Sequence, residues 1–122
     1  MQHKNKTKEF GRVSKQRKAL WRTMLGSLIM REKIKTTEAK AKELKMRVDK
    51  IINKAKKGED KLKKIAVVRD LKKEIPQMAV KKITGEFLNK FKSRKSGYAR
   101  VIGLSPRKSD GAKMAVIELI EK

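Results

Sequence analysis

The sequence predicts an α+β fold with helices over most of its length and a β-hairpin at its C-terminal end. Apolar residues recur at helical spacing between residues 14 and 91, whereas residues 98–104 and 114–120 are short, rich in Val, Ile and Leu, and separated by turn formers. Helices followed by a pair of strands are typical of the α+β class. The 122 residues include 36 Lys or Arg and 13 Asp or Glu, a formal charge of +23, so a polyanion is the first candidate partner.

Residues 1–13 are predicted to form an extended basic arm. They hold three Lys, one Arg and one Glu without a helical or strand period, so they cannot bury enough apolar surface to fold alone. A frayed terminus is the alternative, but the density of cations favours an arm that orders against a partner. We therefore divide the chain into an arm, residues 1–13, and a single α+β domain, residues 14–122.

The first helix is expected to begin at Ser14, a good N-cap residue, and to continue for about sixteen residues. Its apolar face has five large residues at helical spacing: Leu20, Met24, Leu25, Leu28 and Ile29. Lys15, Lys18 and Arg22 form a cationic stripe beside this face, because residues at i, i+3 and i+7 share one side of a helix. The first helix is therefore a candidate for contact with phosphate.

A short strand over residues 33–36 and a second helix are expected next. Ile and Thr favour the strand, and Thr36 or Thr37 is expected to cap a helix that ends near Gly58. Such a helix start presents free backbone N–H groups beside Lys35 and Lys40, which suits a phosphate.

Two further helices are expected before the hairpin. One covers residues 60–71, with its inward candidates at Leu62, Ile65, Ala66 and Val68. The other begins at Pro76 and ends before Gly97, with Gly85 weakening its centre by up to about 1 kcal/mol relative to Ala. The hairpin that follows has a basic connecting loop containing Arg107 and Lys108.

Composition excludes most catalytic chemistry. The chain has no Cys and a single imidazole, His3, so thiolate sites, His-based triads and multi-His metal sites are excluded. The seven Gly residues never form a nucleotide-binding loop, and no apolar run approaches the roughly twenty residues of a membrane span. We expect a soluble, non-enzymatic protein with no secretory signal, no cofactor, no membrane association and no small-molecule substrate.

Cations are densest at the N-terminal end of the chain. Residues 1–35 carry 11 Lys or Arg against 2 acids, whereas residues 98–122 carry 5 against 3. The middle helices mix signs, as a solvated helix face usually does. Arg residues are favoured for bidentate phosphate contacts, and the best candidates are Arg12, Arg17, Arg22, Arg94, Arg100 and Arg107. Tyr98 suits either a half-buried strand position or an RNA contact.

Several motifs resemble a known family over essentially the whole chain and in order. They include Thr-Thr-Glu-Ala-Lys-Ala-Lys-Glu-Leu at residues 36–44, Gly-Tyr-Ala-Arg-Val-Ile at residues 97–102, and segments within residues 17–29 and 106–119. Together they resemble the family of the seventeenth protein of the bacterial large ribosomal subunit. The stretch from residue 58 to residue 75 matches least.

The resemblance implies a two-layer α+β fold, about four helices on a small mixed or antiparallel sheet, and a structural role without catalysis. It implies binding to 23S ribosomal RNA near the nascent-chain tunnel exit, neighbouring ribosomal proteins as partners, and a cytoplasmic location in the large subunit. The RNA-facing residues that it implies are His3, Lys4, Arg12, Ser14, Arg17, Lys18, Arg22, Lys35, Thr36, Thr37, Lys40, Tyr98, Arg100 and Arg107. Charge and position add Arg94 and Lys108. A free, nucleoid-type DNA-compacting protein is the alternative, because it would share the charge and the lack of catalytic residues.

Overall fold

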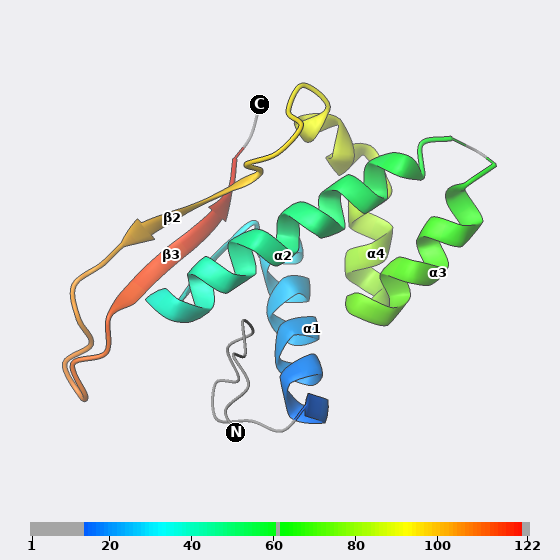
Figure 1. Cartoon of the computed structure of the whole chain (residues 1–122). Coiled ribbons are helices and arrows are strands. Elements are labelled where there is room, and N and C mark those ends of the chain that lie inside the picture. Colours follow the sequence, from blue (N-terminus) through cyan, green and yellow to red (C-terminus); the bar gives the residue numbers. More distant parts are fainter. Residues whose placement is uncertain (1–13, 61, 121–122) are drawn as a thin grey trace, which may run out of the picture.

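The computed structural model describes residues 14–60 and 62–120, so the predicted arm, residues 1–13, lies outside the described part. Its elements follow one another along the chain (Figure 1): α1 (Ser14–Arg31), β1 (Lys33–Thr37), α2 (Glu38–Lys57), α3 (Lys64–Glu74), α4 (Gln77–Ile83), the 3-10 helix η1 (Glu86–Phe91), β2 (Ala99–Gly103) and β3 (Met114–Leu119). The predicted α+β class is confirmed.

A sharp corner at Glu32 joins α1 to β1. Glu32 has a φ of 67°, a left-handed conformation that is unfavourable for a residue with a Cβ. Its carboxylate accepts hydrogen bonds from Nζ of Lys82 at 3.2 Å and Nζ of Lys90 at 3.4 Å. Its carbonyl accepts the amide of Leu119 at 2.9 Å. Partners from α4, η1 and β3 therefore hold the corner that directs β1 into the sheet.

The three strands form an antiparallel sheet in the order β1-β3-β2. Ile117 of the central strand lies opposite Ile34 of β1 and Val101 of β2. The predicted strand at residues 33–36 and the predicted C-terminal hairpin are both confirmed. The pairing of β1 with the last strand of the chain is a long-range contact that no local sequence signal indicates.

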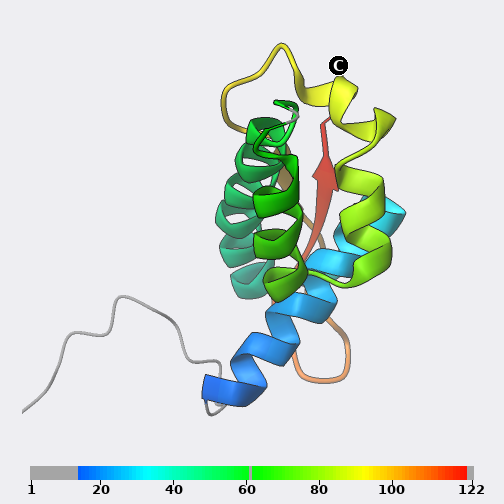
Figure 2. The ribbon, with the colours of Figure 1, turned by 90° about the vertical axis from the view of Figure 1, so that its right-hand side faces the viewer.

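Among the described residues, helices cover one face of this sheet and leave the other face open. Ile117 belongs to the hydrophobic core, and the half-buried Ile34 and Val101 pack against it. Helix α2 contacts all three strands. Beyond the sheet, α2 continues along α3, as Figures 1 and 2 show. On the opposite face Lys35, Arg100 and Ile102 are exposed. The predicted two-layer arrangement is therefore confirmed, with α2 spanning the sheet and the remaining helices.

The third helix differs from its prediction in both bounds and facing. It spans Lys64–Glu74 instead of residues 60–71, and it buries Val67 and Leu71. Of the predicted inward residues, Leu62 is 92% and Ile65 is 68% exposed, and Ala66 is exposed as well, whereas Val68 is half-buried against the core. The predicted face was therefore wrong at three of its four positions, because this short segment carries apolar residues on several sides and its periodicity alone could not select the buried one.

The predicted fourth helix is interrupted at its centre. α4 ends at Ile83, and the chain continues as η1 from Glu86, with Gly85 as the residue before it. The break falls at the glycine that weakens the predicted helix. The apolar stripe survives the break, because Val80, Ile83 and Phe91 are all buried.

A close approach of two elements explains the glycine inside α1. A Cβ placed on Gly26 would lie 2.8 Å from both Cδ and Cγ of Pro76, the residue before α4. Real carbon atoms do not approach so closely without displacement. Trp21, Leu25, Leu28 and Ile29 are buried on the same helix, so α1 is tightly seated on the helical part of the core.

Candidate nucleic-acid interface

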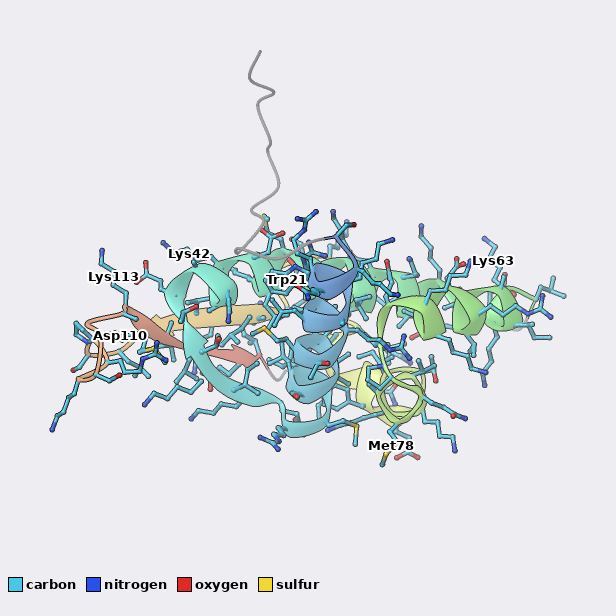
Figure 3. All side chains as sticks on the ribbon, turned by 90° about the horizontal axis from the view of Figure 1, so that it is seen from below. Trp21, Lys42, Lys63, Met78, Asp110 and Lys113 are labelled. Carbon is cyan, nitrogen blue, oxygen red and sulfur yellow. The ribbon has the colours of Figure 1, made fainter. Side chains whose placement is uncertain are left out.

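Lysine and arginine side chains project around most of the described molecule, as Lys42, Lys63 and Lys113 illustrate in Figure 3. Positive charge by itself therefore does not distinguish one face from another. A candidate interface is better recognised by cations that gather without neutralising acids.

Four of the predicted site residues lie on α1. Ser14 is the first residue of the helix rather than the residue before it, and it is exposed, as is Lys18. Arg17 and Arg22 are half-buried. Nη1 of Arg22 donates a hydrogen bond of 2.6 Å to the carbonyl of Lys72, so its guanidinium reaches from α1 to α3. Three further predicted residues, His3, Lys4 and Arg12, lie outside the described residues.

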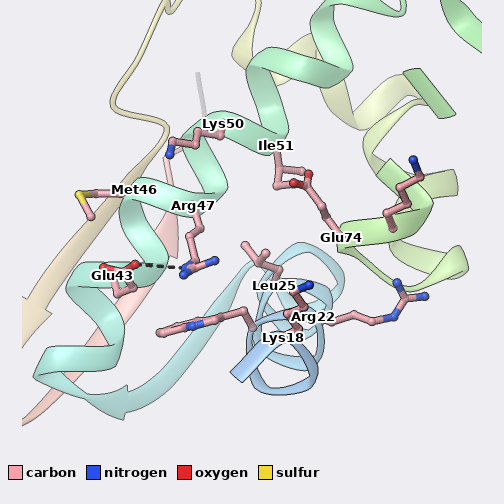
Figure 4. A pocket seen from close by; sticks show the side chains of 11 residues that line it. Lys18, Arg22, Leu25, Glu43, Met46, Arg47, Lys50, Ile51 and Glu74 are labelled. Atoms are coloured by element: carbon pink, nitrogen blue, oxygen red, sulfur yellow. Dashed lines mark hydrogen bonds and ion pairs between the residues drawn. The ribbon is translucent and has the colours of Figure 1, made fainter. Parts of the chain in front are cut away.

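A hollow of about 590 Å³ lies between α1, α2 and α3, and we call it the basic groove (Figure 4). Its charged lining comprises five cations and two acids: Lys18, Arg22, Arg47, Lys50, Lys73, Glu43 and Glu74. Trp21, Leu25, Met46 and Ile51 complete it. The stripe predicted on α1 therefore forms one wall of a larger cationic surface.

Both acids of the basic groove are already paired. Oε1 of Glu43 lies 3.2 Å from Nε of Arg47, four residues along α2. Oε2 of Glu74 lies 3.1 Å from Nζ of Lys54, which is outside the groove lining. Among the residues that the structure describes, neither Lys18 nor Lys50 forms an ion pair. The groove therefore retains a surplus of positive charge.

The guanidinium of Arg47 covers the indole of Trp21. Its Cζ lies 4.6 Å from the centroid of the ring, a cation–π distance, while its Nε donates a hydrogen bond of 3.2 Å to Oε1 of Glu43. Sequence reasoning missed Arg47, Lys50 and Lys73 as site residues. The only available signal was the i, i+4 spacing of Glu43 and Arg47, because nothing along the chain brings α2 and α3 beside α1.

The predicted group at the start of α2 is only partly suited to phosphate. Thr37 is the N-cap residue and makes no side-chain capping hydrogen bond; Thr36 and Lys40 are half-buried, and Lys35 is exposed on the open face of the sheet. Glu38 occupies the first turn, where its amide donates to the carbonyl of Lys113 at 2.9 Å. A carboxylate at this position already compensates the positive end of the helix dipole.

The predicted arginines of the hairpin are engaged within the hairpin itself. Nε of Arg100 donates to Oε1 of Glu118 on the neighbouring strand. Nε and Nη2 of Arg107 donate to Oδ1 and Oδ2 of Asp110 at 3.0 and 2.6 Å. This bidentate pair, followed by the backbone amide of Ala112, lowers the pKa of Asp110 to about 2. Lys108 at the tip is exposed.

Tyr98 lies in the core. The sequence left a half-buried strand position and an RNA contact open, and the structure shows a buried side chain. Its side chain is fully buried, and its hydroxyl lies 2.5 Å from Oδ1 of Asn53 and 3.1 Å from the carbonyl of Arg94. Nζ of Lys56 donates to the same hydroxyl at 2.8 Å. The carboxylate of Asp49 accepts the backbone amide of Tyr98 at 3.1 Å. The half-buried Arg94 therefore belongs to the packed segment around Tyr98.

Neither a metal site nor a membrane span is found in the part of the chain that the structure describes. No group of three or more His, Asp or Glu residues there could hold a metal ion. No helix in residues 14–60 and 62–120 is long and apolar enough to cross a membrane. The fold and its groove define a basic α+β protein with a surface suited to a polyanion.

Comparison with known proteins identifies the family. The family model of ribosomal protein L17 matches residues 20–120. The chain is 43% identical over 119 residues to large ribosomal subunit protein bL17 of Staphylococcus carnosus (strain TM300), and 39% identical over 122 residues to bL17 of Staphylococcus haemolyticus (strain JCSC1435). Each comparison covers 93% of this chain and 98% of the relative. The chain belongs to the ribosomal protein L17 family.

Family membership confirms the resemblance described from the sequence motifs. The protein is a structural, non-enzymatic constituent of the ribosome, located in the large subunit and thus in the cytoplasm. As such it associates with ribosomal RNA and with other ribosomal proteins.

Proposed function

We propose that the protein binds the 23S ribosomal RNA near the nascent-chain tunnel exit, through phosphate contacts of its lysines and arginines. The observation that carries this proposal is the surplus of cations over acids on α1 and in the basic groove. Lys and Arg side chains are the usual partners of phosphate oxygens. The location near the tunnel exit is supported by the family resemblance alone.

The proposed contact set follows the sequence prediction, with one residue removed. It comprises the arm residues His3, Lys4 and Arg12, then Ser14, Arg17, Lys18, Arg22, Lys35, Thr36, Thr37, Lys40, Arg94, Arg100, Arg107 and Lys108. Tyr98 is removed because its side chain is fully buried. Arg100 and Arg107 remain in the set with only part of each guanidinium facing a partner, because Glu118 and Asp110 occupy the rest. We further propose that residues 14–122 form one RNA-binding domain and residues 1–13 an arm.

Binding of this kind depends steeply on salt. Each neutralised phosphate releases condensed counterions, so a protein with six to ten phosphate contacts loses about 10³–10⁵ in affinity between 50 and 200 mM salt. We therefore expect the affinity for 23S rRNA fragments to fall linearly in a plot of log affinity against log salt.

The proposal is tested by crosslinking the protein within purified large subunits and mapping the crosslinked nucleotides. We expect adducts in 23S rRNA around the tunnel exit and stoichiometric sedimentation with large subunits after DNase treatment. Adducts confined to other regions of the subunit would overturn the location. Recovery of the protein mainly on chromosomal DNA would favour the DNA-compacting alternative instead.

A further inference from the structure

The basic groove is lined by three helices, and its cations outnumber its acids. We propose that it holds one strand of the RNA backbone by its phosphates without reading the bases. This inference rests on the proposed function, because it assigns a particular part of the RNA to a particular surface. It adds Lys50 and Lys73 to the contact set and gives Arg47 a separate role.

The charge of the groove matches a phosphodiester strand. Glu43 is neutralised by Arg47 inside the groove and Glu74 by Lys54 outside it. Four cations remain from three helices: Lys18 and Arg22 of α1, Lys50 of α2 and Lys73 of α3. Cations on several sides of one hollow reinforce each other's attraction for a negative chain lying between them.

Arg22 is held in a position that suits this role. Its Nη1 donates to the carbonyl of Lys72 at 2.6 Å, which fixes the planar fork while leaving its other N–H groups available. A fixed guanidinium loses less conformational entropy on binding phosphate than a mobile one. Figure 4 shows Arg22 extending from α1 toward α3, on the side of the groove away from Glu43.

The stack of Arg47 on Trp21 argues against base recognition. Proteins that bind single-stranded nucleic acids in general offer aromatic faces on which bases stack. Trp21 is the aromatic residue of this groove, it is almost entirely buried, and Arg47 lies over its ring. A base therefore has no open aromatic face here, and the groove is left with sequence-independent contacts to phosphate.

The lining also favours RNA over a protein partner. The core of a protein interface is poor in charge and rich in exposed apolar and aromatic surface. In this groove Trp21, Leu25 and Ile51 are buried and Met46 is 57% exposed, while the other seven lining residues are charged. A protein partner would have to desolvate these charges.

The absence of Cys from the chain permits a direct test. Met46→Cys places a unique thiol in the groove lining, and Met78→Cys is the matched control. Met78 is 69% exposed on α4 and lies away from Trp21 in Figure 3. Each variant is labelled with a short photoreactive crosslinker, assembled into large subunits and irradiated. We expect the Met46 derivative to crosslink to rRNA several-fold more efficiently than the Met78 derivative.

The adducts distinguish the possible occupants of the groove. Adducts of the Met46 derivative with a ribosomal protein in place of rRNA would overturn the inference, as would equal rRNA crosslinking from both positions. If the wild-type protein in large subunits gives no crosslink to 23S rRNA at all, the proposed function fails, and this inference fails with it. If the wild-type protein does crosslink to 23S rRNA but the Met46 derivative gives no rRNA adduct, only the groove assignment is wrong.

A charge experiment tests the same groove without labelling. Lys18→Gln combined with Lys50→Gln removes two exposed groove cations, and Lys45→Gln combined with Lys81→Gln removes two exposed cations outside the lining. We expect the groove pair to make the plot of log affinity against log salt less steep, by about two in the magnitude of its slope. The loss of affinity should be the same for RNA fragments of different sequence. The inference is wrong if the control pair lowers the slope equally, or if the loss depends on RNA sequence.

Discussion

The β2–β3 hairpin and the basic groove use cationic side chains in opposite ways. In the hairpin, Arg100 is paired with Glu118 and Arg107 with Asp110, so both guanidinium groups stabilise local structure. In the groove five cations face two acids that are already paired, which leaves Lys18 and Lys50 without acidic partners among the described residues. The comparison shows that a cation becomes available to a polyanion when the fold keeps acids away from it.

The largest expected effect concerns the core beside the hairpin, where Tyr98 holds the cation of Lys56 in a structural role. Tyr98→Ala should reduce the free energy of unfolding by about 3–5 kcal/mol, because it leaves a cavity in the core and strips Lys56 and Asn53 of a buried partner. Urea unfolding followed by circular dichroism measures this loss. Tyr98→Phe keeps the ring and should cost about 1–3 kcal/mol.

Binding data would sharpen the same comparison. At a temperature where Tyr98→Phe is folded, its affinity for rRNA should equal that of the wild type. Unchanged stability combined with weaker RNA binding would place Tyr98 among the contact residues and contradict its assignment to the core.

Gly26→Ala tests whether the packing of α1 supports the groove side of the comparison. The added Cβ would meet the ring of Pro76 at 2.8 Å, and this overpacking should destabilise the protein by about 1–3 kcal/mol. Gly103→Ala in the hairpin is the matched control, because a Cβ there has open space, and it should change stability by less than about 1 kcal/mol. Thermal unfolding compares the two, and similar losses would mean that the close approach to Pro76 carries no cost.

Glu32 lies between α1, which lines the groove, and β1 of the sheet. Removing the charge of its carboxylate should have a smaller effect on the free energy of unfolding. Burial would raise the pKa of Glu32, but hydrogen bonds and charges from Lys82 and Lys90 outweigh it and lower the pKa. The stabilisation is thus present above the ordinary pKa of a Glu and is lost as pH falls through the lower native pKa. Because the carboxylate is partly exposed, Glu32→Gln should cost about 0–1 kcal/mol at neutral pH.

Unfolding midpoints of wild type and Glu32→Gln, measured from neutral pH down to about pH 3, test this linkage. The difference between the two proteins should shrink as the pH falls. A difference that stays constant over the whole range would show that the carboxylate contributes through packing and not through its charge.

The smallest expected effect is local and belongs to the hairpin tip. The pKa of Asp110 is about 2 because Arg107 and then the Ala112 amide donate to its carboxylate, so the tip should keep its hydrogen bonds down to about pH 3 and lose them near pH 2. Carboxyl carbon shifts in NMR spectra follow the titration. In Arg107→Lys the bidentate fork is absent, so the pKa of Asp110 should move up toward its ordinary value; an unshifted pKa would assign the effect to the backbone amide.

Much of the fold could be predicted because its signals are local. The apolar periods of α1 and α2, the helix stop at Gly58 and the turn formers before β3 each act over a few residues. The facing of α3 could not be predicted, because Leu62 and Ile65 look as suitable for burial as Val67 does until α2 lies alongside. The role of Gly26 could not be predicted either, because the close neighbour is fifty residues away in Pro76.

The candidate site divides in the same way. The stripe on α1 was predictable, since Lys18 and Arg22 lie on one helical face. The contributions of Arg47, Lys50 and Lys73 were not, because they depend on how three helices pack around Trp21. The same limit explains Tyr98, whose sequence context suits the surface and the core equally well.

The charge of +23, the order of helices and strands, and the motifs of the ribosomal protein L17 family can all be recognised along the chain. These properties depend on composition or on neighbours along the chain. Which cations remain available depends on the fold in three dimensions, because an ion pair requires two atoms within a few ångströms and is screened beyond about 8–10 Å in physiological salt. The fold brings Asp110 to Arg107 and Glu118 to Arg100, and it leaves Lys18 and Lys50 beside an open groove.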